Sequence, residues 1–391
     1  MSRINGVIGG VVRPVVRGLT SNKGVGGFNP LDLFASGAYT GFLFDFSKTD
    51  QLWQEFSGVT PVTSDGELVG LALEASRWAG RSTAAQIAQA PDEEVANRFD
   101  SAGWGVIAGW SFNGTNITAA GATSAVGSLS THFAPTAGKR YAVTIVVASI
   151  SGDSLRFRLG NTISGRVISA PGTYTEIITP GATNRFVVAP YAGSGLNCVI
   201  SAYSIKEVVG NHGAQATSAA RPAWKTGGFL RGDAADDNLP TPFLCGASGN
   251  SGAARVTVPA SIAATQIVFG ASGSSANRFF AGFNTSGQLV GGVGSDSTTT
   301  VLHAADYRGL TGTMALVEDG TNWFLYWEGV QVATGARNGA PTTTIPWCIF
   351  AFNNNGTAAS FAVADARRML AITRALTAAE VAKLSTHWST S

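Results

Sequence analysis

Two pairs of adjacent carboxylates, Asp236-Asp237 and Glu318-Asp319, are the first residues in this sequence that suggest acid–base chemistry. Glycosidases need two carboxyl groups roughly 5–10 Å apart across the sugar. On one strand this means acids at i and i+2 or at i and i+4, because neighbouring strand residues point to opposite faces. Neither pair therefore converges. The sequence also lacks a Glu-x-Asp-x-x-Glu run and a G-x-S-x-G nucleophile elbow. We therefore predict no catalytic residue and no enzymatic activity.

A second acidic group consists of Asp233, Asp236 and Asp237, followed by Asn238. Carboxylate and amide oxygens are hard ligands that suit calcium. The same residues also suit an Asx turn that leads into a strand. We favour the turn, so no metal and no other cofactor is expected, and calcium at the three aspartates is left open as the alternative.

The cysteines and histidines are too scattered to form a metal site. No C-x-x-C pair and no H-x-H or H-x-x-x-H pair occurs. We expect the cysteines to be buried free thiols of a protein that folds in a reducing cytoplasm. The residues concerned are Cys198, Cys245, Cys348, His132, His212, His303 and His387.

Sugar binding requires exposed aromatic rings with amide or carboxylate groups beside them. The aromatic candidates are Trp104 and Trp110 in AGWGVIAGW and Tyr191 after Pro190. A polar run supplies amides: Asn353, Asn354 and Asn355. For the two tryptophans the alternative is ordinary packing in the core, because a jelly roll buries aromatic residues near its first strand.

The charge of the chain limits its partners. Only 13% of the residues are charged and the formal net charge is +2, whereas an ordinary soluble domain has roughly 25% charged residues. This balance argues against a nucleic-acid partner, and no apolar run is long enough to cross a membrane. The N-terminal apolar run looks like a signal peptide only superficially, because Arg13, Pro14 and Arg17 interrupt it.

Residues 1–35 have too little apolar content for a core of their own, so we predict an extended docking arm. Its basic residues, which would face an acidic partner, are Arg3, Arg13, Arg17 and Lys23. A small linking module follows at 36–93, in which Leu52, Trp53 and Phe56 can share one helical face.

The rest of the chain alternates short β-branched or aromatic runs with Gly, Pro and Ser turns, which is typical of sandwiches and jelly rolls. We predict an all-β fold of two antiparallel β-sandwich domains in tandem, a jelly roll at 94–209 and a second sandwich at 210–391. In the latter, FLYW and VQVA form a hairpin around Glu328-Gly329. Thr377 and Glu380 form the capping box of a short C-terminal helix.

Four segments are distinctive: GNHGAQATSAARP at 210–222, GDAADD at 232–237, the hairpin LYWEGVQVATG and the ending MLAITRALTAAEVAKL. They resemble the concanavalin-A-like, laminin-G-type domains of tailed-phage virion proteins. FDFSKTDQLWQEFSGVTPVTSDGELVG resembles the short N-terminal module of such proteins, and 94–209 resembles their carbohydrate-binding jelly rolls. LRGDAADD lacks the aromatic-Asp-Gly that usually precedes the double aspartate, so the local turn there is expected to differ.

The resemblance implies a virion structural protein: a tail fibre, a tail tip, or a head fibre or capsid decoration. Its arm would bind other virion proteins, and its sandwiches would bind host-surface glycans. For such a protein we expect a homo-oligomer, taken as a trimer, that is made in the host cytoplasm and located in the virion. The charge and the apolar runs discussed above predict no nucleic-acid partner and no membrane insertion. The alternatives are a bacterial cell-surface or secreted lectin and, third, a polysaccharide-degrading virion enzyme.

Overall fold

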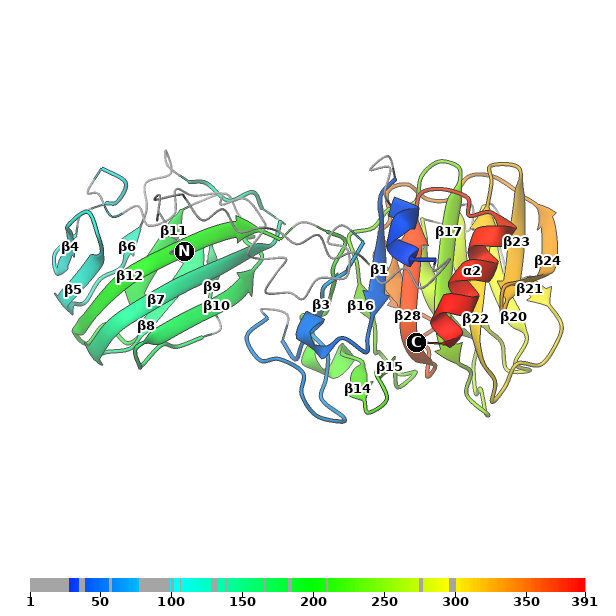
Figure 1. The fold of residues 1–391 in the computed structure, drawn as a ribbon, viewed down its shortest axis with the longest axis horizontal. Helices are drawn as coiled ribbons and strands as arrows, with labels where there is room; N and C mark the ends of the chain where they lie inside the picture. Colours follow the sequence, from blue (N-terminus) through cyan, green and yellow to red (C-terminus); the bar gives the residue numbers. More distant parts are fainter. Residues whose placement is uncertain are drawn as a thin grey trace, which may run out of the picture.

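A computed structural model describes residues 28–34, 39–55, 58–76, 99, 102–105, 107–127, 133–137, 139–164, 166–181, 185–208, 210–273, 277–294 and 300–390. The fold is all-β, with two antiparallel β-sandwiches and one short C-terminal helix, as predicted (Figure 1). The basic residues Arg3, Arg13, Arg17 and Lys23 of the predicted arm, and His132, lie outside the described residues. No helix in the described part of the chain is long and apolar enough to span a membrane.

The first sandwich is the predicted jelly roll, and two antiparallel sheets face each other across its core. The five-stranded sheet runs β10 (Gly172–Ile178), β7 (Tyr141–Gly152), β12 (Leu196–Glu207), β5 (Ile117–Ala122) and β4 (Trp110–Phe112). The four-stranded sheet runs β6 (Val126–Gly127), β11 (Phe186–Pro190), β8 (Leu155–Leu159) and β9 (Thr162–Ile163). Alternating residues such as Val143, Ile145 and Val147 on β7 fill the core between them.

The second sandwich is built from two larger sheets. The first contains β14 (Ala223–Lys225), β15 (Phe229–Arg231), β28 (Asp365–Ile372), β17 (Asn250–Thr257), β22 (Thr311–Glu318), β23 (Asn322–Trp327) and β24 (Val330–Ala336). The second contains β16 (Leu239–Pro240), β25 (Cys348–Ile349), β18 (Gln266–Ser272), β19 (Arg278–Phe283), β20 (Leu289–Gly294) and β21 (Thr300–His303). In addition, β26 (Phe352–Asn354) pairs parallel with β18, and β27 (Thr357–Ala359) pairs antiparallel with β26. A buried apolar cluster that includes Phe269 and Trp347 separates the sheets.

An N-terminal strand completes the first of these sheets. β1 (Gly41–Asp45) pairs antiparallel with β28, from Gly41 opposite Ile372 to Asp45 opposite Arg368. Phe42, Phe44 and Phe46 then point into the core of the second sandwich. The first strand of the 36–93 segment is therefore part of the C-terminal sheet, while the division of the chain into four parts stays a prediction.

The C-terminal helix α2 (Ala378–Ser389) covers the outer face of the same sheet. The predicted capping box is confirmed, because the Thr377 side chain accepts a hydrogen bond from the Glu380 N–H, and the Glu380 carboxylate accepts one from the Thr377 N–H at 2.8 Å. On the next turns Val381, Leu384 and Trp388 pack against the sheet. Short 3-10 helices also occur: η1 (Pro30–Phe34), η2 (Thr49–Gln51) and η3 (Ser218–Ala220).

The predicted hairpin around Glu328-Gly329 is confirmed. It joins β23 to β24, and both turn residues have positive φ, 49° and 77°, as a type I′ turn requires. On β23, Trp323, Leu325 and Trp327 face the core between the sheets, while Phe324 and Tyr326 face the layer under α2.

A small three-stranded sheet stands between the two sandwiches: β13 (Gly213–Ala214), β3 (Leu71–Ala72) and β2 (Leu52–Trp53). The helical face predicted for Leu52 and Trp53 is wrong, because both residues pair with β3 instead. Leu71 and Leu73 pack against Ala142, Ile177 and Val208 of the jelly roll. The two sandwiches thus contact each other through this sheet.

Candidate carbohydrate-binding site

Trp104 and Trp110 do not present exposed rings. Trp104 is 2% exposed and Trp110 is 5% exposed, and both belong to the core of the jelly roll. The Trp110 indole N–H donates to the Ser124 carbonyl at 2.8 Å. Because their faces are covered by neighbouring side chains, the prediction that they form a sugar platform is wrong, and the alternative of core packing is correct.

Tyr191 is the exposed aromatic candidate, with 52% of its surface accessible. It follows Pro190, the last residue of β11, and its N–H donates to the Ser154 carbonyl at 2.8 Å. The Arg156 guanidinium carbon lies 5.7 Å from the centre of the Tyr191 ring. A ring held in this way, with a cation beside it, can stack against a sugar while the cation donates to sugar oxygens.

Asp153 fixes the loop that carries Tyr191. Its carboxylate accepts hydrogen bonds from the N–H groups of Ser154 at 2.7 Å, Ala192 at 2.9 Å and Ser194 at 3.1 Å. Burial alone would raise the pKa of Asp153, but the N–H donors of Ser194, Ser154 and Ala192 hold this pKa below its ordinary value. The loop is therefore ordered before any ligand arrives, which reduces the entropy lost on binding.

The Tyr191 loop lies at the outer end of the jelly roll. Leu196, at the start of β12, is opposite Gly152 of β7, whereas Glu207 at its other end is opposite Tyr141. The end of the jelly roll that contains Glu207 and Tyr141 continues into the small sheet and the second sandwich. Figure 1 shows β7 and β12 running from this end to the outer end of the jelly roll. A strand as long as β12, which has 12 residues, spans roughly 40 Å. Tyr191 is therefore well separated from the second sandwich.

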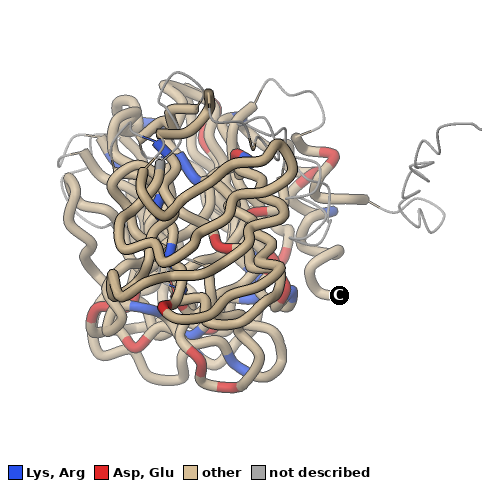
Figure 2. The backbone as a smooth tube through the Cα atoms, turned by 90° about the vertical axis from the view of Figure 1, so that its left-hand side faces the viewer, with Lys and Arg blue, Asp and Glu red and all other residues tan. Residues whose placement is uncertain are grey.

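Charged residues are sparse in the part of the jelly roll that the structure describes. Figure 2 views the molecule from the jelly-roll side, and most of the chain in view is uncharged. Such a surface suits a neutral or weakly charged ligand better than a nucleic-acid backbone.

On the second sandwich, Asn353 and Asn354 end β26, and Asn355 begins the turn that leads to β27. The Asn353 side chain accepts from the Gly356 N–H at 2.8 Å and donates to the Pro346 carbonyl at 2.9 Å. Asn355 has a φ of 49°, and its N–H donates to the Ser272 carbonyl at 2.7 Å. Asn354 and Asn355 are exposed. Since the asparagines and Tyr191 lie on different sandwiches, they do not form one site.

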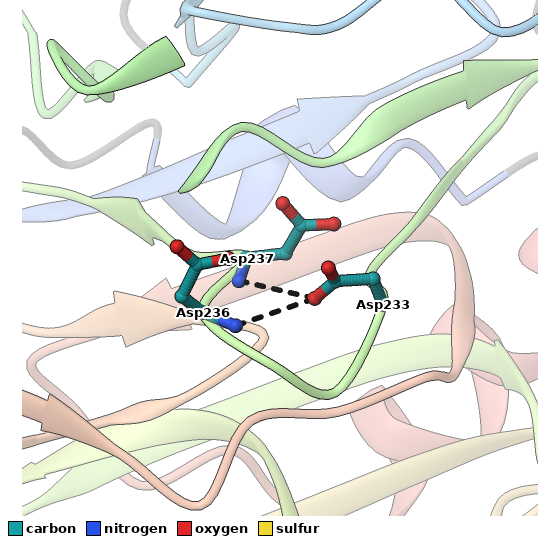
Figure 3. Close-up of side chains that lie close together, drawn as sticks. All are labelled: Asp233, Asp236 and Asp237. Atoms are coloured by element: carbon teal, nitrogen blue, oxygen red, sulfur yellow. Dashed lines mark hydrogen bonds between the residues drawn. The ribbon is translucent and has the colours of Figure 1, made fainter. Parts of the chain in front are cut away.

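Asp233, Asp236 and Asp237 lie together, with carboxylate oxygens within 4.8 Å of one another. The Asp233 carboxylate accepts from the Ala235 N–H at 2.8 Å. It also accepts from the N–H groups of Asp236 at 3.3 Å and Asp237 at 3.4 Å (Figure 3). This is the expected Asx turn, with Ala234 at a φ of 63°. The turn accounts for the position of the aspartates, so the cluster carries no metal assignment.

Asp237 makes this turn sensitive to pH. Burial, and then the charges of Asp233 and Asp236, raise the pKa of Asp237 to about 7. A carboxyl whose pKa is raised in the folded state contributes stability below its unfolded pKa, and this contribution is lost as pH rises through about 7. We therefore expect Asp237→Asn to raise the melting temperature by about 2–4 °C at pH 8, for a gain of about 1 kcal/mol after allowance for solvent access.

Differential scanning calorimetry at pH 5 and pH 8 checks this prediction. The gain should be smaller at pH 5, because the cost of keeping Asp237 in the fold grows with pH between its ordinary pKa of 3.8 and the raised value of about 7. The less buried Asp236→Asn should gain less at pH 8. If instead calcium raised the wild-type melting temperature at pH 8 and Asp237→Asn abolished that rise, a cation between the carboxylates would replace the turn as the explanation.

The other adjacent acids, Glu318 and Asp319, have structural roles. Glu318 is fully buried, and its carboxylate accepts from the Asn250 amide at 2.6 Å and pairs with Arg337 at 2.8 Å. Asp319 accepts from the N–H groups of Thr321 and Asn322 at 2.8 and 2.7 Å. Each carboxylate is therefore held by structural hydrogen bonds rather than aimed at a shared ligand.

The three cysteines are free and buried, as predicted. Burial raises the pKa of Cys198 to about 11 and those of Cys245 and Cys348 to about 12. At neutral pH these thiols stay protonated, so they are poor nucleophiles.

Comparison with known proteins gives a limited result. No protein-family model and no curated protein sequence matches the chain. A solved CBM40 domain of Ruminococcus gnavus IT-sialidase, bound to α2,3-sialyllactose, is 16% identical with a TM-score of 0.29, over 36% of this chain and 84% of that one. The binding domain of botulinum neurotoxin serotype D is 5% identical with a TM-score of 0.32, over 41% and 42%. At these TM-scores the likenesses carry no argument about what the chain binds.

Proposed function

We propose that this chain is a non-enzymatic virion structural protein of a tailed phage, of the tail-fibre, tail-tip or head-fibre and decoration type, that displays its β-sandwiches to bind host-surface glycans. The observation that carries the glycan half is the exposed Tyr191 ring on a loop fixed by Asp153 at the outer end of the jelly roll. The virion half rests on the sequence resemblance and on the basic residues of the N-terminal arm.

The Tyr191 site suits weak binding at each copy, with a higher overall affinity when several copies bind together. One half-exposed ring and one guanidinium give a shallow platform, so the affinity of a single site should be low. In an oligomer several such sites engage a surface together, and avidity raises the overall affinity without new contacts. The structural hydrogen bonds of Glu318 and Asp319 also support a role without hydrolysis.

Tyr191→Ala should weaken glycan binding at least about tenfold, which corresponds to about 1.4 kcal/mol of binding free energy. Glycan arrays of the intact chain, followed by titration of the strongest binder, measure this loss. The melting temperature should hardly change, since truncation of an exposed side chain is usually worth less than about 0.5 kcal/mol.

The second sandwich provides a matched control. Tyr39 is 40% exposed and has the Arg374 guanidinium carbon 5.6 Å from its ring centre, so Tyr39→Ala removes a similar pair at another place. Its binding should equal that of the wild type. Full glycan affinity in Tyr191→Ala would contradict the proposed site.

Immunogold electron microscopy of purified particles, with an antibody against residues 210–391, tests the virion half. Label at the tail tip or along fibres supports host recognition, and label over the head supports a decoration role. Absence of label on every particle would contradict the virion assignment and favour a free lectin.

A further inference from the structure

A pocket of about 460 Å³ lies where the jelly roll meets the second sandwich. Its walls come from three stretches of the chain, within 139–140, 207–214 and 240–242. The jelly roll contributes Lys139, Arg140 and Glu207, and the other wall includes Asn211 and Thr241. The pocket is on the opposite end of β7 and β12 from Tyr191, so it is separate from the site proposed above.

Arg140 gives this pocket an uncompensated positive charge. Its Nη1 donates to the His212 carbonyl at 3.2 Å, while its buried Nε has no hydrogen-bond partner. Burial lowers the pKa of Arg140 to about 10, which leaves it charged at neutral pH. The nearby Glu207 is paired with Lys139 at 2.8 Å, and none of the ion pairs between described residues involves Arg140.

A mostly buried guanidinium without a carboxylate partner is unfavourable unless an anion reaches it. The planar guanidinium matches a carboxylate, because two N–H groups can donate in parallel to its two oxygens. Lys139, Arg140 and Glu207 together leave one positive charge, which a singly charged anion balances. The volume of the pocket exceeds what a bare carboxylate needs and leaves room for a sugar ring.

We propose that this pocket binds a sugar that bears a carboxylate, of the uronic-acid class, with Arg140 as the residue that recognises the anion. The sugar half of this assignment rests on the proposed glycan-binding function, whereas the anion half rests on Arg140 alone. The Asn211 side-chain amide already donates to the Gly41 carbonyl at 2.6 Å, so its oxygen remains to accept from a sugar hydroxyl. An occupied pocket would connect the two sandwiches, since its walls belong to both.

Isothermal titration calorimetry of the full chain with sodium glucuronate and with glucose tests the proposal. Glucuronate should bind the wild type at least tenfold more tightly than glucose. Arg140→Gln should remove that difference, whereas Tyr191→Ala should leave it intact, which separates this site from the Tyr191 site. Equal affinity for glucuronate and glucose, or an undiminished preference in Arg140→Gln, would overturn the assignment.

Arg166 is the matched control. Like Arg140 it has a buried Nε without a partner, and its Nη2 donates to the Val59 carbonyl at 3.2 Å. It does not line the pocket, so Arg166→Gln should bind glucuronate as the wild type does. If Arg166→Gln lost as much glucuronate affinity as Arg140→Gln, the loss would reflect a general effect on the packing between the two sandwiches. That result would overturn the assignment of the site.

A rim variant keeps the test valid if Arg140→Gln does not fold. Lys139 is exposed, and Lys139→Glu places a negative charge at the mouth of the pocket, which should weaken glucuronate binding several-fold and leave glucose unchanged. Sodium sulfate is the bare-anion probe. If it bound as tightly as glucuronate, a simple anion site would replace the acidic-sugar site.

Discussion

Replacing Trp104 by alanine is expected to lower the free energy of unfolding of the jelly roll by about 3–5 kcal/mol, the range for truncation of a buried large aromatic side chain. The indole is 2% exposed and lies among three rings. It stacks on Phe112 with ring centres 5.7 Å apart, and it meets Phe186 and Tyr203 edge-on at 6.0 and 5.8 Å. Alanine leaves a cavity that these rings can fill only in part.

Scanning calorimetry of the intact chain measures this loss as a downward shift of the jelly-roll transition. Tyr191→Ala in the same domain is the control and should shift that transition little, because its ring is exposed. A Trp104→Ala protein with wild-type stability but reduced glycan affinity would contradict the core position of Trp104.

Deleting residues 1–46 is expected to prevent the second sandwich from folding. The deletion removes β1, which leaves one edge of β28 without its partner, and it removes three buried phenylalanines. Phe42 lies 5.5 Å from Phe243 and 6.1 Å from Trp347 between ring centres, and Phe44 stacks on Phe46 at 5.7 Å. Loss of one buried phenylalanine side chain costs about 3–5 kcal/mol of unfolding free energy. The three losses, together with the lost pairing of β1 with β28, exceed the stability of a typical domain, which is about 5–15 kcal/mol.

Deleting residues 1–27 is the matched control, because the described contacts of the second sandwich begin at Phe28 and Leu33, under α2. This shorter deletion should leave both calorimetric transitions in place and, under the proposed virion role, abolish incorporation into particles. A folded second sandwich in the 1–46 deletion would contradict the structural role of β1.

Local signals made parts of this fold predictable. Thr377 and Glu380 form a cap within a single turn, and Glu328-Gly329 form a two-residue turn, so neighbouring residues decide both features. By contrast, Leu52 and Trp53 are compatible with a helical face, but their pairing with β3 decides the outcome. The pairing of β1 with β28 depends on a partner far along the chain, which no local pattern reveals.

The candidate sites show the same limit. Tyr191 was predictable because it follows Pro190 at the start of a loop, whereas the sequence does not show that the tryptophans in AGWGVIAGW face inward. Arg140 directly precedes the β-branched strand β7, and nothing in the local sequence shows that its guanidinium lines a pocket together with Asn211 and Thr241. Only the arrangement of the two sandwiches brings these residues together.

The pairing of β1 with β28 also determines the order in which the chain can fold during synthesis. Thr40 and Thr373, which meet at the end of this pairing, are separated by 333 positions. The ribosome must therefore complete nearly the whole chain before β1 meets its partner, while the jelly roll between them can fold earlier. Until then the apolar strand Gly41–Asp45 has no pairing partner. Slow translation, or translation that ends before β28 is made, would therefore expose an aggregation-prone segment. Nascent chains stalled before residue 365 should accordingly recruit chaperones far more than the finished protein does.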